Sequence, residues 1–490
     1  SDAPNRLAVI CGPDRLRYRD YWACIAALAH ELRDMGVAHG DRVATLLANS
    51  ADAAIATFGV QASGAQLVPL NPSYTPAELK PVLADAAPRA VLCDRAIEDR
   101  VRSVIPAGVS IIAIGEGVRR LTMPAARFAE LLFPALPAPD WLSTLQYTGG
   151  TTGVPKGVNL THGATAANVA QREAAVPTLD GERVMCITPL FHVYAVSMGL
   201  YLAANCRGTL YVGKKFDADS VLETISRERI TFLSASPTIL LGLMRAESFP
   251  HADLGSLRVC SSGSAALAEE TLLRWERATG CVICEGYGQT EAGPVLTYNP
   301  VSGPRKPGTV GPALPLTEIG IVDPESGTRV LPRGEVGEVR ARGPQVMSGY
   351  LNRAAETAET LRDGWLYTGD IGRLDEDGYL TICDRKKDMV ITAGFNVYPR
   401  EIEEALFAHP GVAEAAAIGI PDPYRGEALL ALVVRRDRTL SAEEISAHLA
   451  DRLTKYKWPR EIRFLDALPR TSVGKIDKAA LRKMTSSRQA

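Results

Sequence analysis

Residues 147–158 carry the clearest chemical signal in the chain, because they combine four glycines and three threonines with Lys156. Glycine lets backbone N–H groups turn toward a ligand, threonine adds hydroxyl donors, and lysine adds a point charge. This combination suits the terminal phosphates of a nucleotide. It is not the G-x-x-x-x-G-K-[ST] phosphate loop, because Gly157 follows Lys156. A surface turn of the same composition is the alternative that this segment alone leaves open.

Two later segments supply groups for other parts of a nucleotide. Tyr287 offers a flat ring that can stack on a base, and the nearby Thr290 and Glu291 offer oxygens to Mg²⁺ and phosphate. Asp370 is expected at the end of a β-like run, and its two carboxylate oxygens suit a ribose diol. A capped turn at the end of a strand and an Asp-initiated turn are the respective alternatives.

Charged residues in the last quarter of the chain complete this set. The run DRKKD at 384–388 is typical of a solvated face, and it also suits a hinge whose arginine contacts a nucleotide. Lys475 follows Ser-Val-Gly on an expected flexible loop, so it can bring a point charge into a distant site. A solvent-exposed lysine is the alternative.

Length and composition bound the class of protein. A chain of 490 residues exceeds the size of a single core and therefore predicts more than one domain. A net charge of −2 disfavours nucleic acid as a partner. Nine thinly spread cysteines indicate a reduced, cytoplasmic protein. Residues 184–206 lack Asp, Glu, Lys and Arg, but Pro189, His192 and Asn205 interrupt them, so we expect no membrane span.

Apolar spacing predicts alternating helices and strands in the first part of the chain. We expect helices over 18–35, 53–63 and 76–86, and strands over 41–47, 65–70, 229–233, 257–261 and 282–285. This order predicts a parallel sheet with helices on its faces. The first helix is expected to present Trp22, Ile25, Leu28 and Leu32 on one side.

The composition and the apolar pattern of the sequence change twice after about Asn299. Dense Gly and Pro with short β-like runs, such as 338–342, predict a small barrel or a distorted sheet. Beyond 388, we expect helices over 399–407 and 441–453 and strands over 415–418 and 429–434. About a hundred residues of this kind predict a separate α+β domain.

The five motifs together, in this order, resemble the adenylate-forming superfamily of acyl-CoA synthetases, non-ribosomal adenylation domains and luciferases. The resemblance covers essentially the whole chain. It implies an α/β fold with a large N-terminal domain of parallel-type αβα layered sheets plus a small distorted β-barrel. A small mobile α+β C-terminal domain follows. The implied domains are 1–386, which binds AMP and the acyl group, and 387–490, with the hinge at Lys387.

The resemblance also implies which residues hold ATP. Its phosphates would meet the Gly/Thr loop, its adenine the ring of Tyr287, its ribose the carboxylate of Asp370 supported by Arg385, and its Mg²⁺ the carboxylate of Glu291. The full set of implied nucleotide-binding residues is Thr148, Thr151, Thr152, Lys156, Gly263, Ser264, Ala265, Glu285, Gly286, Tyr287, Gly288, Asp370, Arg385 and Gly394.

The implied catalytic residues are Lys475, Thr290, Glu291 and His192. Lysine and Mg²⁺ are needed because a carboxylate attacks the α-phosphate of ATP, which brings two anions together. The product is an acyl-adenylate, which then passes its acyl group to the thiol of CoA. The resemblance implies that the C-terminal domain rotates between these steps, so that Lys475 leaves and the loop around Gly394 shapes a pantetheine tunnel.

The substrate is expected to be a small-molecule carboxylic acid with an apolar body. Amino-acid-activating relatives keep an aspartate near the position of His192, where this chain reads Phe-His-Val-Tyr. Gly263, Gly286 and Gly288 are small and are expected to leave room for a chain or a ring. We favour a medium- or long-chain fatty acid. An aryl or hydroxycinnamic acid, an enzyme that loads a carrier protein and a silent nucleotide-binding protein are the alternatives. The chain is expected to be a monomer or a homodimer.

Overall fold

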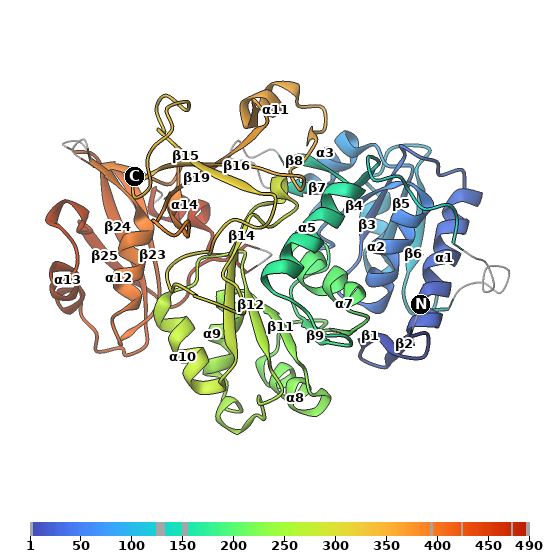
Figure 1. The fold of residues 1–490 in the computed structure, drawn as a ribbon, viewed down its shortest axis with the longest axis horizontal. Coiled ribbons are helices and arrows are strands. Elements are labelled where there is room, and N and C mark those ends of the chain that lie inside the picture. Colours follow the sequence, from blue (N-terminus) through green and yellow to red (C-terminus); the bar gives the residue numbers. More distant parts are fainter. Residues whose placement is uncertain are drawn as a thin grey trace.

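The computed structural model describes residues 3–123, 133–148, 155–392, 395–422, 425–471 and 474–486. The molecule is a mixed α/β structure in which a larger N-terminal part contains three sheets and a smaller C-terminal part contains a fourth (Figure 1). The fold class expected from the sequence is therefore confirmed.

The first sheet has seven strands, and its core is parallel. Its order is β17-β8-β7-β4-β3-β5-β6, and parallel pairing runs from β7 through β4, β3 and β5 to β6. β8 pairs antiparallel with β7, so the two strands flank the Gly/Thr segment. The bounds are β3 (Arg42–Leu46), β4 (Gln66–Pro69), β5 (Ala90–Asp94), β6 (Ser110–Ile114), β7 (Leu142–Thr148), β8 (Lys156–Thr161) and β17 (Gly349–Tyr350).

The second sheet has eight strands in the order β14-β13-β12-β11-β9-β10-β1-β2. Its six central strands, from β13 to β1, pair in parallel, while β14 and β2 are antiparallel edges. The bounds are β1 (Leu7–Cys11), β2 (Asp14–Arg17), β9 (Arg183–Cys186), β10 (Thr209–Val212), β11 (Phe232–Ala235), β12 (Val259–Ser262), β13 (Val282–Tyr287) and β14 (Thr297–Tyr298).

Helix α2 (Ala51–Ser63) joins the two large sheets, because it contacts β1 of one sheet and β3 and β4 of the other. Ser50 caps its N-terminus by accepting from the Ala53 N–H at 3.1 Å, and Gly64 ends it at a φ of 92°. Its residues are buried except for Phe58, which is half-buried, as expected for a helix between two sheets.

The other helices of the N-terminal part lie either on the outer faces of the sheets or, like α2, between the two large sheets (Figure 1). They are α1 (Tyr18–Asp34), α3 (Pro76–Ala86), α4 (Glu98–Arg102), α5 (His162–Ala175), α6 (Val193–Ala195), α7 (Leu202–Asn205), α8 (Ala218–Glu228), α9 (Pro237–Arg245), α10 (Glu269–Thr279) and α11 (Ala354–Thr360). α1 buries Ile25, Leu28 and Leu32, whereas Trp22 is 42% exposed and packs edge-on against Phe133. Of the four apolar residues expected on one side of this helix, Trp22 is therefore the one that is not buried.

The region expected to form a small barrel is an antiparallel sheet of five strands. Its order is β15-β16-β19-β18, and β20 pairs with β19. The bounds are β15 (Glu318–Val322), β16 (Gly337–Arg342), β18 (Leu361–Arg362), β19 (Trp365–Leu374) and β20 (Leu380–Arg385). Asp370 lies inside β19 and not at the end of a β-run, because the strand continues past Gly369, which has a φ of +70°.

The C-terminal part has a sheet and a hydrophobic core of its own. The sheet order is β22-β21-β24-β23, with β25 parallel to β24, and α12 and α14 pack on β23. The bounds are β21 (Val390–Thr392), β22 (Phe395–Val397), β23 (Val412–Asp422), β24 (Gly426–Arg435), β25 (Glu461–Leu465), α12 (Pro399–Phe407), α13 (Ala442–Ala450) and α14 (Lys478–Ser486). Both strands expected here are longer than the apolar runs that predicted them.

Two further expectations concern the strand at 229–233 and the apolar stretch 184–206. Arg229 ends α8 in the left-handed region, with a φ of 52°, so β11 begins only at Phe232. The stretch 184–206 forms most of β9, a loop, α6, a π-helix over Val196–Tyr201 and α7. Among the residues that the structure describes, no helix combines the length and apolarity needed to span a bilayer.

Candidate active site

Tyr287, Asp370 and Arg385 form a polar cluster, called the Asp370 cluster below. The Tyr287 hydroxyl donates to Asp370 Oδ2 at 2.6 Å, and Arg385 Nε lies 3.5 Å from Asp370 Oδ1. The sequence brings them together because Asp370 in β19 stands opposite Arg385 in β20, while Tyr287 ends β13 of the second sheet. Burial raises the pKa of Asp370, and the positive charge of Arg385 opposes that shift.

Glu291 and Lys156 meet at Tyr350, a residue that the sequence motifs did not single out. The Tyr350 hydroxyl donates to Glu291 Oε1 at 2.8 Å, and Lys156 Nζ lies 5.1 Å from the centre of the Tyr350 ring. Tyr350 reaches this place because β17 pairs antiparallel with β8, which begins at Lys156. The hydroxyl of Tyr350 therefore holds the Glu291 carboxylate, and the Lys156 ammonium group lies over the face of the Tyr350 ring. Thr290 starts the same short 3₁₀ turn as Glu291.

The ends of β7 and β8 place the flanks of the Gly/Thr segment. Thr148 ends β7 opposite Lys156, and both residues are half-buried. Thr151, Thr152 and Gly394 lie outside the described residues.

A turn at residues 263–265 and the end of β13 form the neighbouring wall. Ser264 has a φ of +67°, a conformation that is strained for a residue with a side chain, while Ala265 is exposed. A Cβ on Gly288 would lie 1.9 Å from the carbonyl oxygen of Pro294, so only glycine fits there. Glu285 is buried and accepts from the Leu267 N–H at 3.1 Å, and burial raises its pKa to about 7.

Two tyrosine rings fill the space beside the glycines expected to enclose the acyl group. A Cβ on Gly263 would lie 2.8 Å from the ring of Tyr194, and one on Gly286 would lie 2.6 Å from the ring of Tyr298. Both hydroxyls contact the Ser261 side chain, that of Tyr194 at 3.0 Å. These glycines therefore accommodate protein side chains, and the expectation that they leave open room for substrate is wrong at these two positions.

His192 caps the N-terminus of the short helix α6. Its Nδ1 accepts from the Tyr194 N–H at 3.3 Å. Burial and the nearby charge of Lys475 lower its pKa to about 3, so the ring is neutral. Because Nδ1 accepts, the ring proton belongs on Nε2, where it can serve as a donor to an anion.

Lys475, from the C-terminal part, reaches the same place. Its charge acts on His192 and on Asp370, and the charge of Arg385 acts on it, so its ammonium group lies near all three. Burial lowers its pKa to about 8, the charge of Arg385 lowers it further, and Asp370 opposes both. The structure therefore brings together the histidine, the lysine and the Asp370 cluster, which come from five separate segments of the sequence.

Lys387 lies in the turn between β20 of the third sheet and β21 of the fourth. The turn is closed by hydrogen bonds from the Asp388 N–H and the Met389 N–H to the Arg385 carbonyl, at 2.9 and 3.1 Å. Burial lowers the pKa of Lys387, and the charge of Arg385 adds to this effect. The residue is thus placed where the chain passes from one sheet to the other.

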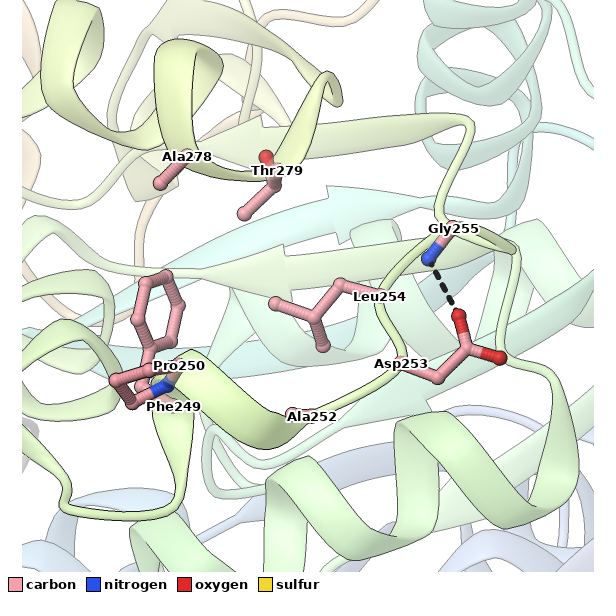
Figure 2. A pocket seen from close by; sticks show the side chains of 8 residues that line it. All are labelled: Phe249, Pro250, Ala252, Asp253, Leu254, Gly255, Ala278 and Thr279. Atoms are coloured by element: carbon pink, nitrogen blue, oxygen red, sulfur yellow. Dashed lines mark hydrogen bonds between the residues drawn. The ribbon is translucent and has the colours of Figure 1, made fainter.

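An open pocket of about 510 Å³ lies elsewhere, between the loop at 249–255 and the end of α10 (Figure 2). Its lining residues are Phe249, Pro250, Ala252, Asp253, Leu254, Gly255, Ala278 and Thr279. None of them belongs to the predicted site. Among the described residues, no three His, Cys, Asp or Glu side chains are grouped so as to hold a metal ion by themselves.

In this arrangement a lysine of the C-terminal part lies beside a cluster of polar groups of the N-terminal part, as expected for an enzyme whose two parts share one site. Comparisons with known proteins agree. The family model described as AMP-binding enzyme matches residues 1–351, and that described as AMP-binding enzyme C-terminal domain matches residues 401–475. The chain belongs to the AMP-binding enzyme family. It is an AMP-forming acid–CoA ligase, a class whose substrates are ATP, CoA and a small carboxylic acid.

Similar proteins span nearly the whole chain. A long-chain-fatty-acid–CoA ligase of Bacillus subtilis is 36% identical over 96% of this chain and 90% of its own length. 4-Coumarate–CoA ligase 5 of Oryza sativa subsp. japonica is 34% identical over 98% and 92%. The ATP-bound structure of MatB from Rhodopseudomonas palustris superposes with a TM-score of 0.93 at 34% identity, over 100% of this chain and 98% of that one. The apo structure of the same protein gives 0.82.

Proposed function

We propose that this enzyme activates a medium- or long-chain fatty acid with ATP and Mg²⁺ and transfers the acyl group to CoA by domain alternation. The observation that carries the proposal is that Lys475 lies near enough to His192, Asp370 and Arg385 for their charges to interact. A lysine supplied by a separate part of the chain can assist one half-reaction and leave before the other. The higher TM-score to the ATP-bound relative supports the same arrangement.

The Asp370 cluster would hold the nucleoside. Asp370 has two acceptor oxygens for the ribose hydroxyls, and Tyr287 is anchored by its hydroxyl to that carboxylate, which orients its ring for adenine. Arg385 favours the ionised form of this buried carboxylate, because its charge opposes the rise in pKa that burial causes. Lys156 and Thr148, with Thr151 and Thr152, would meet the phosphates, and the turn of Gly263, Ser264 and Ala265 would flank the base.

The residues around Glu291 fit Mg²⁺. A carboxylate and the Thr290 hydroxyl are hard oxygen donors, and Mg²⁺ in nucleotide sites is commonly held by one or two carboxylates together with phosphate oxygens. Glu291 is fixed by the Tyr350 hydroxyl at Oε1. When bound, the ion would neutralise charge on the phosphates.

His192 and Lys475 would act on the acid. The Nε2–H of the neutral His192 donates to one oxygen of the substrate carboxylate and orients it. The other oxygen attacks the α-phosphorus, and the bond from that phosphorus to the bridging oxygen of pyrophosphate breaks. Lys475 lies between the two anions as they approach and stabilises the developing charge.

The second half-reaction requires a different arrangement. We infer that residues 387–490 rotate about Lys387, which withdraws Lys475 and brings the loop around Gly394 toward the adenylate. The thiol of CoA then displaces AMP from the acyl carbonyl. Gating by domain motion commonly limits turnover in enzymes of this kind.

The choice of a fatty acid is supported by the similarity to the B. subtilis relative, which is named a long-chain-fatty-acid–CoA ligase. An aryl acid is the second candidate. It is favoured by the buried rings of Tyr194 and Tyr298 beside the acyl region, which suit contact with a flat ring, and by the likeness to a 4-coumarate–CoA ligase.

The test is a panel of acids with MgATP, with and without CoA. Hexanoate, dodecanoate, hexadecanoate, benzoate and 4-coumarate are compared by pyrophosphate release and by thioester formation. We expect the highest kcat/KM with dodecanoate or hexadecanoate. A higher kcat/KM with 4-coumarate would show that the substrate is an aryl acid and not a fatty acid. Pyrophosphate release without any thioester would favour an enzyme that loads a carrier protein.

A further inference from the structure

Glu414 links the C-terminal part to helix α9 of the N-terminal part. Its Oε2 accepts from Arg470 Nη2 at 2.7 Å, and its Oε1 pairs with Arg245 Nη1 at 3.2 Å. Arg245 ends α9, and its Nη2 also donates to the Ala413 carbonyl at 2.9 Å. One carboxylate at the start of β23 therefore bridges an arginine of its own sheet domain and an arginine of the other part.

Arg470 extends this link to the peptide that precedes Lys475. Its Nη1 donates to the Gly474 carbonyl at 2.9 Å and to Thr238 Oγ1, also at 2.9 Å. The Thr238 hydroxyl in turn donates to the Gly474 carbonyl at 3.3 Å. Thr238 lies in the first turn of α9, so both ends of this one helix contact the lysine loop through the same network.

The lysine loop keeps its own shape by separate hydrogen bonds. The Thr471 N–H donates to the Lys475 carbonyl at 2.8 Å, and the Gly474 N–H donates to the Thr471 carbonyl at 2.9 Å. Gly474 has a φ of +81°, which a glycine adopts without strain. These local bonds form within the C-terminal part, so they do not determine where the loop lies on the N-terminal part.

The network is partly shielded from solvent. The side chain of Glu414 is 15% exposed, that of Arg470 is 28% exposed and that of Arg245 is 42% exposed. Single exposed ion pairs contribute little, but a carboxylate shared by two arginines and shielded from water is held more firmly. The contacts of Arg245 and Thr238 also vanish whenever the two parts of the chain separate.

We propose that Thr238, Arg245, Glu414 and Arg470, called the docking network below, are positioning residues for Lys475 in the adenylation half-reaction. The proposal deepens the proposed function and rests on it. The network seats the Gly474–Lys475 peptide on α9, so the lysine reaches the acid and the α-phosphate. Its contacts across the two parts must break before CoA attacks. Its loss therefore slows adenylate formation and leaves thioester formation intact.

The test measures the two half-reactions separately, with dodecanoate and MgATP for pyrophosphate release and with supplied dodecanoyl-adenylate and CoA for thioester formation. Thr238→Val keeps the shape and removes the hydroxyl, which takes part in two hydrogen bonds, so kcat for adenylation should fall about tenfold. Arg245→Gln should reduce it about fivefold. KM for ATP should change less than twofold, because neither side chain belongs to the nucleotide site.

Two matched variants control for a general structural effect. Thr238→Ser retains the hydroxyl and should restore adenylation to near the wild-type rate. Arg227→Gln removes a surface arginine of α8 that pairs with Glu223 at 2.5 Å, and it should alter neither half-reaction. In the double variant Arg245→Gln, Glu414→Gln, the loss should be smaller than the product of the single losses, because both act through one ion pair.

Three results would overturn the proposal. Equal loss of both half-reactions in Thr238→Val would mean a structural effect only. Unchanged adenylation in both Thr238→Val and Arg245→Gln would mean that the network does not position Lys475. Strictly multiplicative effects in the double variant would mean that Arg245 and Glu414 act separately. A wild-type enzyme that releases no pyrophosphate with any acid would instead contradict the proposed function.

Discussion

Asp370 and Lys475 lie close together in the site, yet the chain holds them there in different ways. Asp370 lies inside a strand, is 7% exposed and is bonded to Tyr287 and Arg385 within the N-terminal part. Lys475 is carried on a loop of the C-terminal part, and that loop contacts α9 through the docking network. The proposed nucleotide site is therefore built into the larger part, whereas the lysine proposed to act in adenylation is supplied by the smaller part.

This difference predicts which changes affect one half-reaction and which affect both. Under the proposed function, residues of the Asp370 cluster would hold the nucleotide in both steps. Lys475 and the turn at Lys387 should each separate the two steps, in opposite directions. The predictions below test that separation, beginning with the largest expected effect.

Lys475→Ala should nearly abolish adenylation and spare the second step. Loss of a charge aimed at the developing transition state costs about 3–4 kcal/mol, or roughly 10²–10³ in rate. Pyrophosphate release with dodecanoate measures the first step, and thioester formation from supplied dodecanoyl-adenylate measures the second. If Lys475→Ala slowed both half-reactions equally, Lys475 would not act in adenylation alone, and the proposed difference between Asp370 and Lys475 would be wrong.

Lys387→Pro should have the opposite effect. Proline restricts φ, so it should hinder rotation about this turn and slow thioester formation about ten- to a hundredfold while adenylation continues. The substitution leaves the backbone hydrogen bonds of the turn in place, since their N–H donors belong to Lys386, Asp388 and Met389. Lys386→Pro, which removes the N–H that donates to the Gly369 carbonyl at 2.9 Å, is the control for damage to the turn itself. Normal overall turnover in Lys387→Pro would exclude Lys387 as the pivot.

Candidate site residues that belong to short motifs could be predicted from the sequence, whereas the contacts that hold these residues in place could not. Five of the candidate site residues belong to short motifs, and such motifs can be recognised in the sequence without knowledge of the fold. These residues are Tyr287, Asp370, Arg385, His192 and Lys475. The contact of Tyr350 with Glu291 could not be predicted from the sequence, because it depends on a strand of only two residues. The only sequence feature around Tyr350 is the short run Ser-Gly-Tyr. Arg245 and Glu414 are 169 residues apart and carry no motif at all.

The acyl region shows a second limit of sequence reasoning. Gly263 and Gly286 looked like open space, because a glycine has no side chain to fill a pocket. The space is taken by the rings of Tyr194 and Tyr298, which approach from α6 and β14. A glycine in the sequence shows that its own side chain fills no space. Whether the space stays open depends on how other helices and strands pack against it, which the residue type does not show. Substrate choice is therefore the least predictable property of this site.

The pH dependence of adenylation should follow Lys475. Its pKa is lowered from 10.5 to about 8, so the ammonium form dominates below pH 8 and is lost above it. We expect kcat/KM for ATP to fall toward about tenfold per pH unit above pH 8. Lys475→Arg stays protonated, so its residual activity should not show this fall. A wild-type profile that is flat up to pH 9.5 would contradict the assignment.

Glu285 should produce the smallest effect, on stability. Its folded pKa of about 7 lies above the ordinary 4.5, so the stability it contributes is fully present below about pH 4.5 and is lost as pH rises toward 7. Glu285→Gln keeps an acceptor for the Leu267 N–H and cannot ionise. Its free energy of unfolding should match wild type near pH 4.5 and exceed it by roughly 1–3 kcal/mol at pH 8, measured by urea denaturation.

The same carboxylate also reports on the joint between the two parts. Arg400 of α12 opposes the effect of burial on the pKa of Glu285, although the two residues belong to different parts of the chain. Arg400→Gln should therefore raise the pKa of Glu285 further and enlarge the stabilisation by Glu285→Gln at pH 8. If the two substitutions are strictly additive, the C-terminal part is not docked in the free enzyme, and Lys475 arrives only with its substrates.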